Sequence, residues 1–340
     1  MQYSEAYQKE LVPQYVEGLL TCGERKVCTN IANVMNASHD EIYSNFEKSI
    51  EKQDQTVRDL EKLALKHLNQ AQIMAIFDDS RNTKLYAKEI EGLDVGFDSS
   101  TKKIMLGFTI VNALLTDGNI DIPVNCMQYV NKELAQGSYM NKGEIAITII
   151  SELIKTFNLQ RVLADAHYAT EKVFKFLCEH SLNFLMKIPR NRKVIVNSKN
   201  DQLQNMLKLK KNQRTAYTKA EIYGISLYFY VIKLETKATV YFVSNGLINP
   251  YEVYQLYKLR WNIEIFHRVA KQQLGLGDCQ MRASEKQRQH ALFVMYAYAV
   301  ASIYRYILNF DCIENVIKHF RIEKLKNLYG QSSYLNRSLN

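Results

Sequence analysis

The chain has 340 residues, of which 47% are hydrophobic, so it can bury a large core and is not an intrinsically disordered protein. Lys and Arg total 44 and Asp and Glu total 35, which gives a formal net charge of +9. A basic balance of this size favours a polyanionic partner, either a nucleic acid or a membrane surface.

The spacing of the cysteines and the length of the apolar segments exclude further classes of protein. The six cysteines include no C-x-x-C pair, which argues against a zinc ribbon or a disulfide scaffold and fits a reducing cytosol. The N-terminal residues contain no apolar segment typical of a signal peptide. The most apolar long stretch, residues 291–304, ends at Arg305 and is shorter than the roughly 20 residues that a membrane span needs. We therefore expect a buried helix there, no membrane partner and a cytoplasmic location.

The first 70 residues predict helices. Ile31, Val34 and Met35 form a short apolar face, and Ser38 stands three residues before Glu41, the capping-box arrangement that begins a new helix. A helix, a short turn and a second helix in a basic chain are typical of a helix-turn-helix DNA reader. An ordinary helical hairpin packed on the next domain fits the same pattern equally well.

From residue 73 the pattern changes to short apolar runs. Residues 73–77 form a continuous run typical of a strand buried on both faces, and the polar residues Asp78, Asp79 and Ser80 are expected to end it. The following segments predict two strands, a helix, a strand that ends at Asp165, a helix and a strand. They are residues 104–111, 120–127, 142–157, 161–164, 170–179 and 184–188. This order is that of a ribonuclease H-like domain, although other α/β folds share it.

A basic stretch and a β-rich stretch follow. Residues 187–214 carry nine basic residues and one acidic residue, which favours a DNA-facing loop over an ordinary solvated face. Residues 220–244 are rich in Tyr, Ile, Val and Phe and predict two or three strands. Together the two stretches have the pattern of an antiparallel insertion in a larger domain.

A long helix is expected to begin at Asn249 and Pro250, with Asn as the cap and Pro at the first helical position. At about 100° per residue, four of its side chains fall within one arc of about 60°. They are Tyr257, Arg260, Glu264 and Lys271. On spacing alone, a surface helix with an Arg260–Glu264 pair worth a few tenths of a kcal/mol accounts for this pattern as well.

The spacing Tyr257-x2-Arg260-x3-Glu264-x6-Lys271 resembles the Tyr-Arg-Glu-Lys signature of a large group of bacterial insertion-sequence transposases with DDE catalytic domains. Neighbouring segments match the same family. RWNIEIFHRVAK resembles its catalytic-glutamate helix, YFVSNGLINP the strand and loop before that helix, IFDDS its first acidic motif and VLADAHYAT its second. The resemblance covers roughly residues 70 to 310, which is most of the chain.

The resemblance implies an α/β fold: a ribonuclease H-like mixed-sheet catalytic core with an inserted antiparallel β region and an N-terminal helical domain. It places the catalytic glutamate on a helix that follows the insertion. The expected domains are 1–70 (helical, with a possible DNA-binding role), 71–190 (first part of the core), 191–248 (β-rich insertion), 249–312 (catalytic Glu helix and following helix) and 313–340 (C-terminal tail).

A catalytic carboxylate triad is implied by the same resemblance. Asp165 matches the second acid and Glu264 the third. Asp78 and Asp79 compete for the first position, and the family pattern of an Asp immediately before Ser or Thr selects Asp79. The expected catalytic and metal-binding residues are therefore Asp79, Asp165 and Glu264.

The chemistry of phosphodiester cleavage explains these residue types. Two divalent cations can stabilise the attacking and the leaving oxygen together, and Mg²⁺ prefers oxygen ligands. We expect two Mg²⁺ ions as cofactors and expect that Mn²⁺ can replace them. The resemblance also assigns Tyr257, Arg260 and Lys271 to DNA contacts near the cut. Next to them, Trp261 is expected to be buried and His267 to have a structural role.

The function implied is that of a DNA transposase. It would cleave DNA at the terminal inverted repeats of its element and join the freed 3′-hydroxyl to target DNA, as a homodimer in the DNA complex and in association with the nucleoid. One alternative is a catalytically decayed or domesticated DNA-binding repressor of the element. Another is a nuclease that hydrolyses nucleic acid without strand transfer. The presence of all three acids and all four signature residues favours the active transposase.

Overall fold

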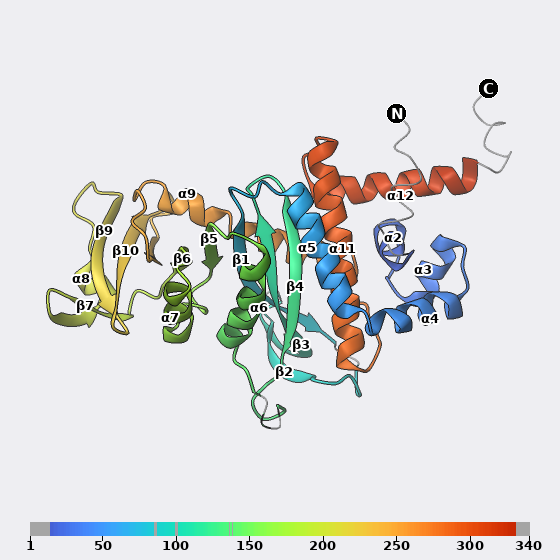
Figure 1. The fold of residues 1–340 in the computed structure, drawn as a ribbon, viewed down its shortest axis with the longest axis horizontal. Helices are drawn as coiled ribbons and strands as arrows, with labels where there is room; N and C mark the ends of the chain where they lie inside the picture. The colour runs from blue at the N-terminus through green and yellow to red at the C-terminus, as the bar shows by residue number, and fades with distance from the viewer. Residues whose placement is uncertain (1–13, 85–86, 99–100, 136, 138, 331–340) are drawn as a thin grey trace.

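The computed structural model describes residues 14–84, 87–98, 101–135, 137 and 139–330 as a mixed α/β protein (Figure 1). Residues 1–13 of the expected helical domain and residues 331–340 of the expected tail lie outside the described part. A long twisted sheet forms the body of the molecule, and helices gather at one end of it (Figure 1).

Helices dominate the N-terminal part, as predicted. They are α2 (Gln14–Thr21), α3 (Cys28–Met35), α4 (His39–Ile50) and α5 (Gln53–His67). The hydroxyl of Ser38 accepts a hydrogen bond from the backbone N–H of Glu41 at 3.1 Å, which confirms the predicted start of α4. Helices α2, α4 and α5 all contact α11 (Ser284–Ile307), so this helical region packs directly on the core.

Among the described residues, the sheet has eleven strands in the order β2-β3-β1-β5-β6-β11-β10-β9-β7-β8, with β4 also paired to β3. The strands of its first half are β1 (Met74–Thr83), β2 (Asp94–Asp98), β3 (Lys103–Thr116), β4 (Asp121–Tyr129), β5 (Arg161–Ala164) and β6 (Phe184–Lys187). Strand β1 pairs antiparallel with β3 and parallel with β5. Helix α6 (Lys142–Thr156) connects β4 to β5, and α7 (Glu171–Glu179) connects β5 to β6. This arrangement confirms the ribonuclease H-like α/β core.

Strand β1 is longer than predicted. The sequence pattern was expected to end the strand at Asp78, yet the strand continues through Asp79 and Ser80 to Thr83. The reason is its pairing with β3, which continues without a register shift from Met74 to Thr83, so the ladder of backbone hydrogen bonds extends beyond the apolar run.

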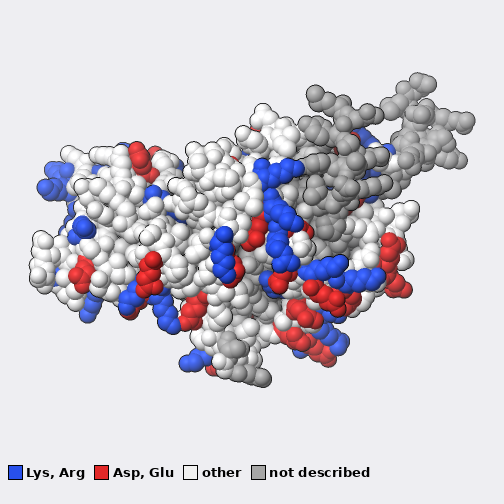
Figure 2. All heavy atoms as spheres, viewed as in Figure 1, with Lys and Arg blue, Asp and Glu red and all other residues white. Residues whose placement is uncertain are grey.

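The second half of the sheet is the inserted β region, at the far left of Figure 1. Its strands are β7 (Lys193–Val196), β8 (Lys199–Gln202), β9 (Thr215–Ile222), β10 (Ile225–Lys233) and β11 (Thr239–Ser244), with α8 (Leu203–Met206) between β8 and β9. All of their pairings are antiparallel, including the pairing of β11 with β6 that joins the insertion to the core. The basic stretch 187–214 contains β7 and β8, which the sequence pattern did not predict. Figure 2 shows basic side chains, together with acidic ones, at this end of the molecule.

The helix predicted from residue 249 is two helices, α9 (Val253–Lys258) and α10 (Trp261–Gln272). At the junction, the backbone N–H groups of Leu259 and Arg260 donate to the carbonyls three residues earlier, at 3.2 and 3.0 Å. Both junction residues keep helical backbone angles. The interruption is therefore a tightened turn of the 3₁₀ type and not a reversal of direction.

Helix α11 is the central helix of the helical end of the molecule. Nearly all its side chains from Gln287 to Ile303 are buried, which confirms the helix predicted within this stretch and shows that it packs as core. None of the described helices is long and apolar enough to cross a membrane. The chain then turns into α12 (Ile313–Gly330), the described part of the tail.

Candidate active site

The two adjacent acids of β1 point to opposite faces of the sheet. Consecutive residues of a strand alternate between faces, and Asp78 lies directly opposite Asn112 of β3 whereas Asp79 lies opposite Val111. Asp78 accepts a hydrogen bond from Nη1 of Arg260 at 3.0 Å, next to α10. Asp79 accepts from Nζ of Lys142, the first residue of α6, at 2.7 Å. Asp78 thus bonds a residue at the start of α10 and Asp79 a residue at the start of α6, and the charge of Asp79 also acts on Lys271 of α10.

Asp165 lies beside Asp78. The last register pair between the parallel strands β1 and β5 joins Phe77 to Ala164. Asp78 and Asp165 are the next residues of the two neighbouring segments and therefore lie at the same level. The Oδ1 atom of Asp165 accepts a hydrogen bond from the backbone N–H of His167 at 2.8 Å, which orients the carboxylate at the end of β5. Asp165 directly follows the carboxyl end of β5, and α/β proteins commonly place their sites at such strand ends.

Arg260 connects the third acid to the first. Its Nη2 donates to Glu264, one turn further along α10, while its Nη1 donates to Asp78. The side chain of Arg260 is 12% exposed and that of Glu264 is 33% exposed, so solvent reaches the site from the Glu264 side. One guanidinium therefore holds the glutamate of α10 and the aspartate of β1 in a single cluster.

The electrostatics of this cluster are those of crowded carboxylates. Burial, the largest cause, and the nearby charges of Asp165 and Asp79 together raise the pKa of Asp78 to about 7, although Arg260 opposes the shift. Because ionisation of Asp78 is unfavourable here, a cation bound beside it would strongly stabilise the ionised carboxylate. Strongly shifted acids in such a setting are also typical of functional sites.

The two remaining signature residues are Tyr257 and Lys271. Tyr257 packs on Phe242 of β11, with ring centroids 4.7 Å apart, and Arg260 lies 5.6 Å from the centre of the Tyr257 ring. Burial raises the pKa of Tyr257, so its hydroxyl stays a hydrogen-bond donor at neutral pH. Lys271 is half-buried, and burial lowers its pKa while the carboxylates of Asp98 and Asp79 favour its charged form.

The neighbours of the signature residues have different roles. His267 is buried, its Nε2 lies 3.1 Å from Nδ2 of Asn112, and burial lowers its pKa to about 3. The neutral ring ties α10 to the strand position opposite Asp78, which confirms the structural role predicted for His267. The prediction for Trp261 was wrong: its side chain is not buried but 58% exposed, because no element covers that side of α10 in the described structure.

Sequence reasoning missed two residues of this site, Lys142 and Asn112. Asn141 and Glu144 form a capping box that fixes the first turn of α6, and Lys142 stands within that turn. Such a box was a detectable signal for the start of the helix, but the contact of Lys142 with Asp79 depends on the packing of α6. Nothing in the local pattern around Asn112 indicated its link to His267.

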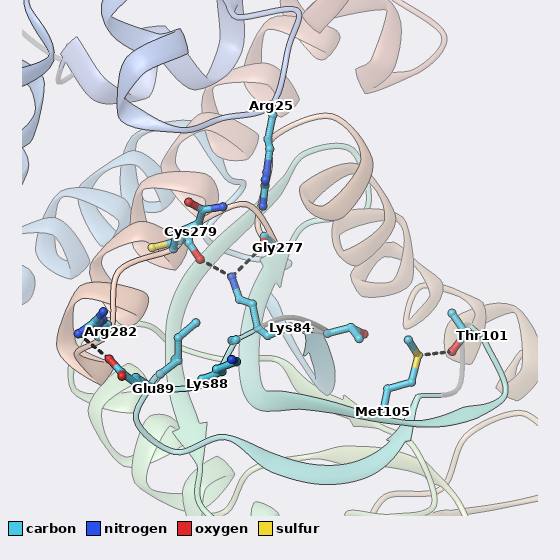
Figure 3. Close-up of a pocket in the computed structure, with 13 residues that line it drawn as sticks. Arg25, Lys84, Lys88, Glu89, Thr101, Met105, Gly277, Cys279 and Arg282 are labelled. Carbon is cyan, nitrogen blue, oxygen red and sulfur yellow. Dashed lines mark hydrogen bonds and ion pairs between the residues drawn. The ribbon is translucent and has the colours of Figure 1, made fainter.

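Within the described residues, no group of three His, Cys, Asp or Glu side chains is arranged to hold a metal ion. The donor types nonetheless suit a hard divalent cation, because Asp78 lies level with Asp165 and is linked through Arg260 to Glu264, and all three are carboxylates. A separate cavity of about 670 Å³ lies elsewhere, between the N-terminal helices, the end of β1 and the loop before α11 (Figure 3). There Nζ of Lys84 donates to the carbonyls of Gly277 and Cys279, at 2.7 and 2.5 Å. None of the acids discussed above lines that cavity.

Two family models match the sequence. The model described as DDE superfamily endonuclease matches residues 2–206, and the model described as transposase DDE domain matches residues 137–300. The chain belongs to the DDE superfamily of endonucleases. The predicted family of DDE transposases is thereby confirmed, whereas the narrower Tyr-Arg-Glu-Lys group stays a prediction. No curated protein matches the sequence.

A solved transposase structure has a fold similar to that of this DDE protein. The piggyBac transposase, in a synaptic complex with hairpin DNA, aligns with a TM-score of 0.52 and 11% identity, over 96% of this chain and 72% of that chain. At this identity the likeness establishes the fold alone. The NurA nuclease of Sulfolobus solfataricus aligns over 93% of this chain and 99% of that chain with a TM-score of 0.28 and 9% identity, which is too low to support an argument.

Proposed function

We propose that this DDE protein is an active DNA transposase, which cleaves DNA strands at the ends of its element and transfers them into target DNA. The observation that supports the proposal most directly is that Asp78 lies level with Asp165 and is linked through Arg260 to Glu264. DDE superfamily nucleases generally use divalent metals. Two Mg²⁺ ions, or Mn²⁺ in their place, would supply Lewis-acid stabilisation of the attacking and leaving oxygens.

Asp165 and Glu264 are the proposed second and third metal ligands, and β1 supplies the first. The sequence pattern selects Asp79 for that role. The contacts favour Asp78, because Asp78 lies level with Asp165 and shares Arg260 with Glu264, whereas Asp79 bonds Lys142. We assign the first ligand to Asp78 on these contacts and keep Asp79 as the alternative.

The signature residues would hold the DNA backbone against these acids. Lys271 offers a compact charge, and the planar fork of Arg260, which donates to Asp78 and Glu264 here, would turn to a phosphate when metal ions take those carboxylates. The protonated hydroxyl of Tyr257 is suited to donate to a phosphate oxygen. The proposed substrates are the terminal inverted repeats and the target DNA. Joining two ends in one reaction favours a homodimer in the DNA complex.

Strand cleavage of DNA that carries the flanking ends of the gene tests this proposal. The purified protein is assayed with Mg²⁺ or Mn²⁺ beside Glu264→Gln and beside Glu252→Gln, a matched change at an exposed glutamate outside the cluster. We expect metal-dependent nicking at the element boundary that is lost in Glu264→Gln alone, with end binding retained. Tight end binding by the wild type without cleavage would favour the repressor alternative. Cleavage by Glu264→Gln at the wild-type rate would contradict the assignment of Glu264.

A further inference from the structure

A buried carboxyl group outside the cluster of acids bonds the helix that carries Glu264. Asp121, the first residue of β4, is 9% exposed. Its Oδ1 accepts a hydrogen bond from Nδ2 of Asn262, in the first turn of α10, at 2.7 Å. Its backbone N–H donates to Oγ of Ser302 on α11 at 3.0 Å. One strand position is therefore bonded to two helices.

The burial of this carboxyl group makes its contact with α10 a demanding one. Burial raises the pKa of Asp121, whereas hydrogen bonds with the side chains of Thr116 and Asn262 oppose the rise. A buried carboxyl group that loses its hydrogen-bond partners is strongly unfavourable. Asp121 therefore holds the amide of Asn262 in one place, although the proposed cleavage chemistry does not use Asp121.

In the described structure, the start of α10 has no side-chain cap. Its N-cap residue, Arg260, keeps helical backbone angles and makes no side-chain hydrogen bond to the first turn. The N–H groups of Asn262 and Ile263 donate to the carbonyls three residues earlier, at 3.1 and 3.2 Å, so the 3₁₀ turn of the junction extends into α10. Since α9 does not continue into α10 as a regular α-helix, contacts with the core fix the first turn. The bond from Asn262 to Asp121 is such a contact.

We propose that Asp121 is a positioning residue, which acts through Asn262 to hold the first turn of α10 in place. At about 100° per residue, Asn262 lies about 160° around the helix from Glu264, so Asp121 holds α10 from the side opposite the cluster. A shift of about 1 Å in a positioned group can reduce a rate about 100-fold. The role in cleavage rests on the proposed transposase function, whereas the hold on α10 does not.

Trp261 is a local reporter of this contact. It is the sole tryptophan of the chain, directly precedes Asn262 and is 58% exposed. Its fluorescence anisotropy and its quenching by acrylamide measure the mobility and the exposure of the first turn of α10, with neither DNA nor metal present. These measurements therefore test the hold on α10 separately from activity.

The test compares the wild type with two changes at Asp121. Asp121→Leu removes the acceptor, whereas Asp121→Asn keeps a carbonyl oxygen that can accept from Asn262. Tyr15→Phe is the matched control, because it removes another buried hydrogen bond, from Tyr15 to Nδ1 of His290 at 3.0 Å, which joins α2 to α11. Melting temperatures show that each variant is folded at the assay temperature.

We expect Asp121→Leu to lower the anisotropy of Trp261, to raise its quenching and to slow cleavage of the flanking ends at least about tenfold, with end binding unchanged. Asp121→Asn should retain most of the rate, and Tyr15→Phe should match the wild type. Asn262→Ala breaks the same bond from the helix side and supplies the test if Asp121→Leu does not fold. The double variant should be no slower than either single variant.

Unchanged Trp261 fluorescence in both Asp121→Leu and Asn262→Ala would overturn the proposal, as would an equal change in Tyr15→Phe. Altered fluorescence with cleavage at the wild-type rate would make Asp121 a purely structural residue and would also overturn the positioning role. A wild type that does not cleave the flanking ends would overturn the transposase proposal instead. The fluorescence of Trp261 would then still decide whether Asp121 holds α10.

Discussion

Nη1 of Arg260 lies 3.0 Å from the carboxylate of Asp78, across 182 positions of sequence. The same guanidinium also donates to Glu264, so a helix after the β insertion is tied to the first strand of the core. This link joins the two parts of the ribonuclease H-like domain that the insertion separates in the sequence. It also provides a positive charge among carboxylates that otherwise repel one another.

Arg260→Lys should retain end binding but reduce the cleavage rate about 100-fold. Lysine keeps the positive charge, yet it lacks the planar fork that reaches two carboxylates at once. The rate is measured on DNA with the flanking ends, beside Arg268→Lys, which changes an exposed arginine of the same helix. A variant as active as the wild type would mean that the double contact of Arg260 has no role in the reaction.

Asp78 should make stability fall as pH rises. Its pKa is about 7 in the folded protein, against an ordinary value of 3.8, so between these values the folded state binds more protons than the unfolded state. The free energy of unfolding therefore decreases through this window as pH rises. Asp78→Asn removes the ionisation and should stabilise the protein at pH 8 by roughly 1–3 kcal/mol, with little effect at pH 4.

Thermal unfolding at both pH values measures this effect. Mg²⁺ should raise the melting temperature of the wild type more at pH 8 than at pH 5, because only the ionised carboxylate attracts the cation strongly. Asp78→Asn should lose most of that gain. A wild type that melts at the same temperature across this pH range, with no response to Mg²⁺, would contradict the described electrostatics of the cluster.

Lys271→Ala should weaken binding to the flanking ends and reduce its salt dependence by about one phosphate contact. Lys271 is half-buried, and the carboxylates of Asp98 and Asp79 favour its charged form. Affinity is measured over a series of salt concentrations, beside Lys326→Ala, whose lysine pairs with Glu323 on α12. An unchanged slope for Lys271→Ala would exclude the phosphate contact.

The hydropathy pattern of the sequence predicts the order of the core strands and helices. It does not predict which way the side chains of the site point. The apolar runs at β1, β3, β4, β5 and β6 and the spacing of α6 and α7 predicted the ribonuclease H-like order. Strand β2 escaped prediction, because its charged residues face inward and its apolar residues outward. The faces of Asp78 and Asp79 depend on the pairing of β1 with β3, and the exposure of Trp261 depends on what packs against α10. These features depend on tertiary packing, so the spacing of residues along a single strand or helix cannot predict them.

Cleavage of the flanking ends by Asp78→Asn, compared with Asp79→Asn, tests the central claim most directly. Both changes remove one carboxylate from adjacent positions of the same strand, so each controls for the other. The account predicts that Asp78→Asn abolishes metal-dependent nicking, whereas Asp79→Asn, which loses the bond to Lys142, retains measurable nicking. Loss of nicking in Asp79→Asn with activity retained in Asp78→Asn would contradict the account and assign the first metal ligand to Asp79.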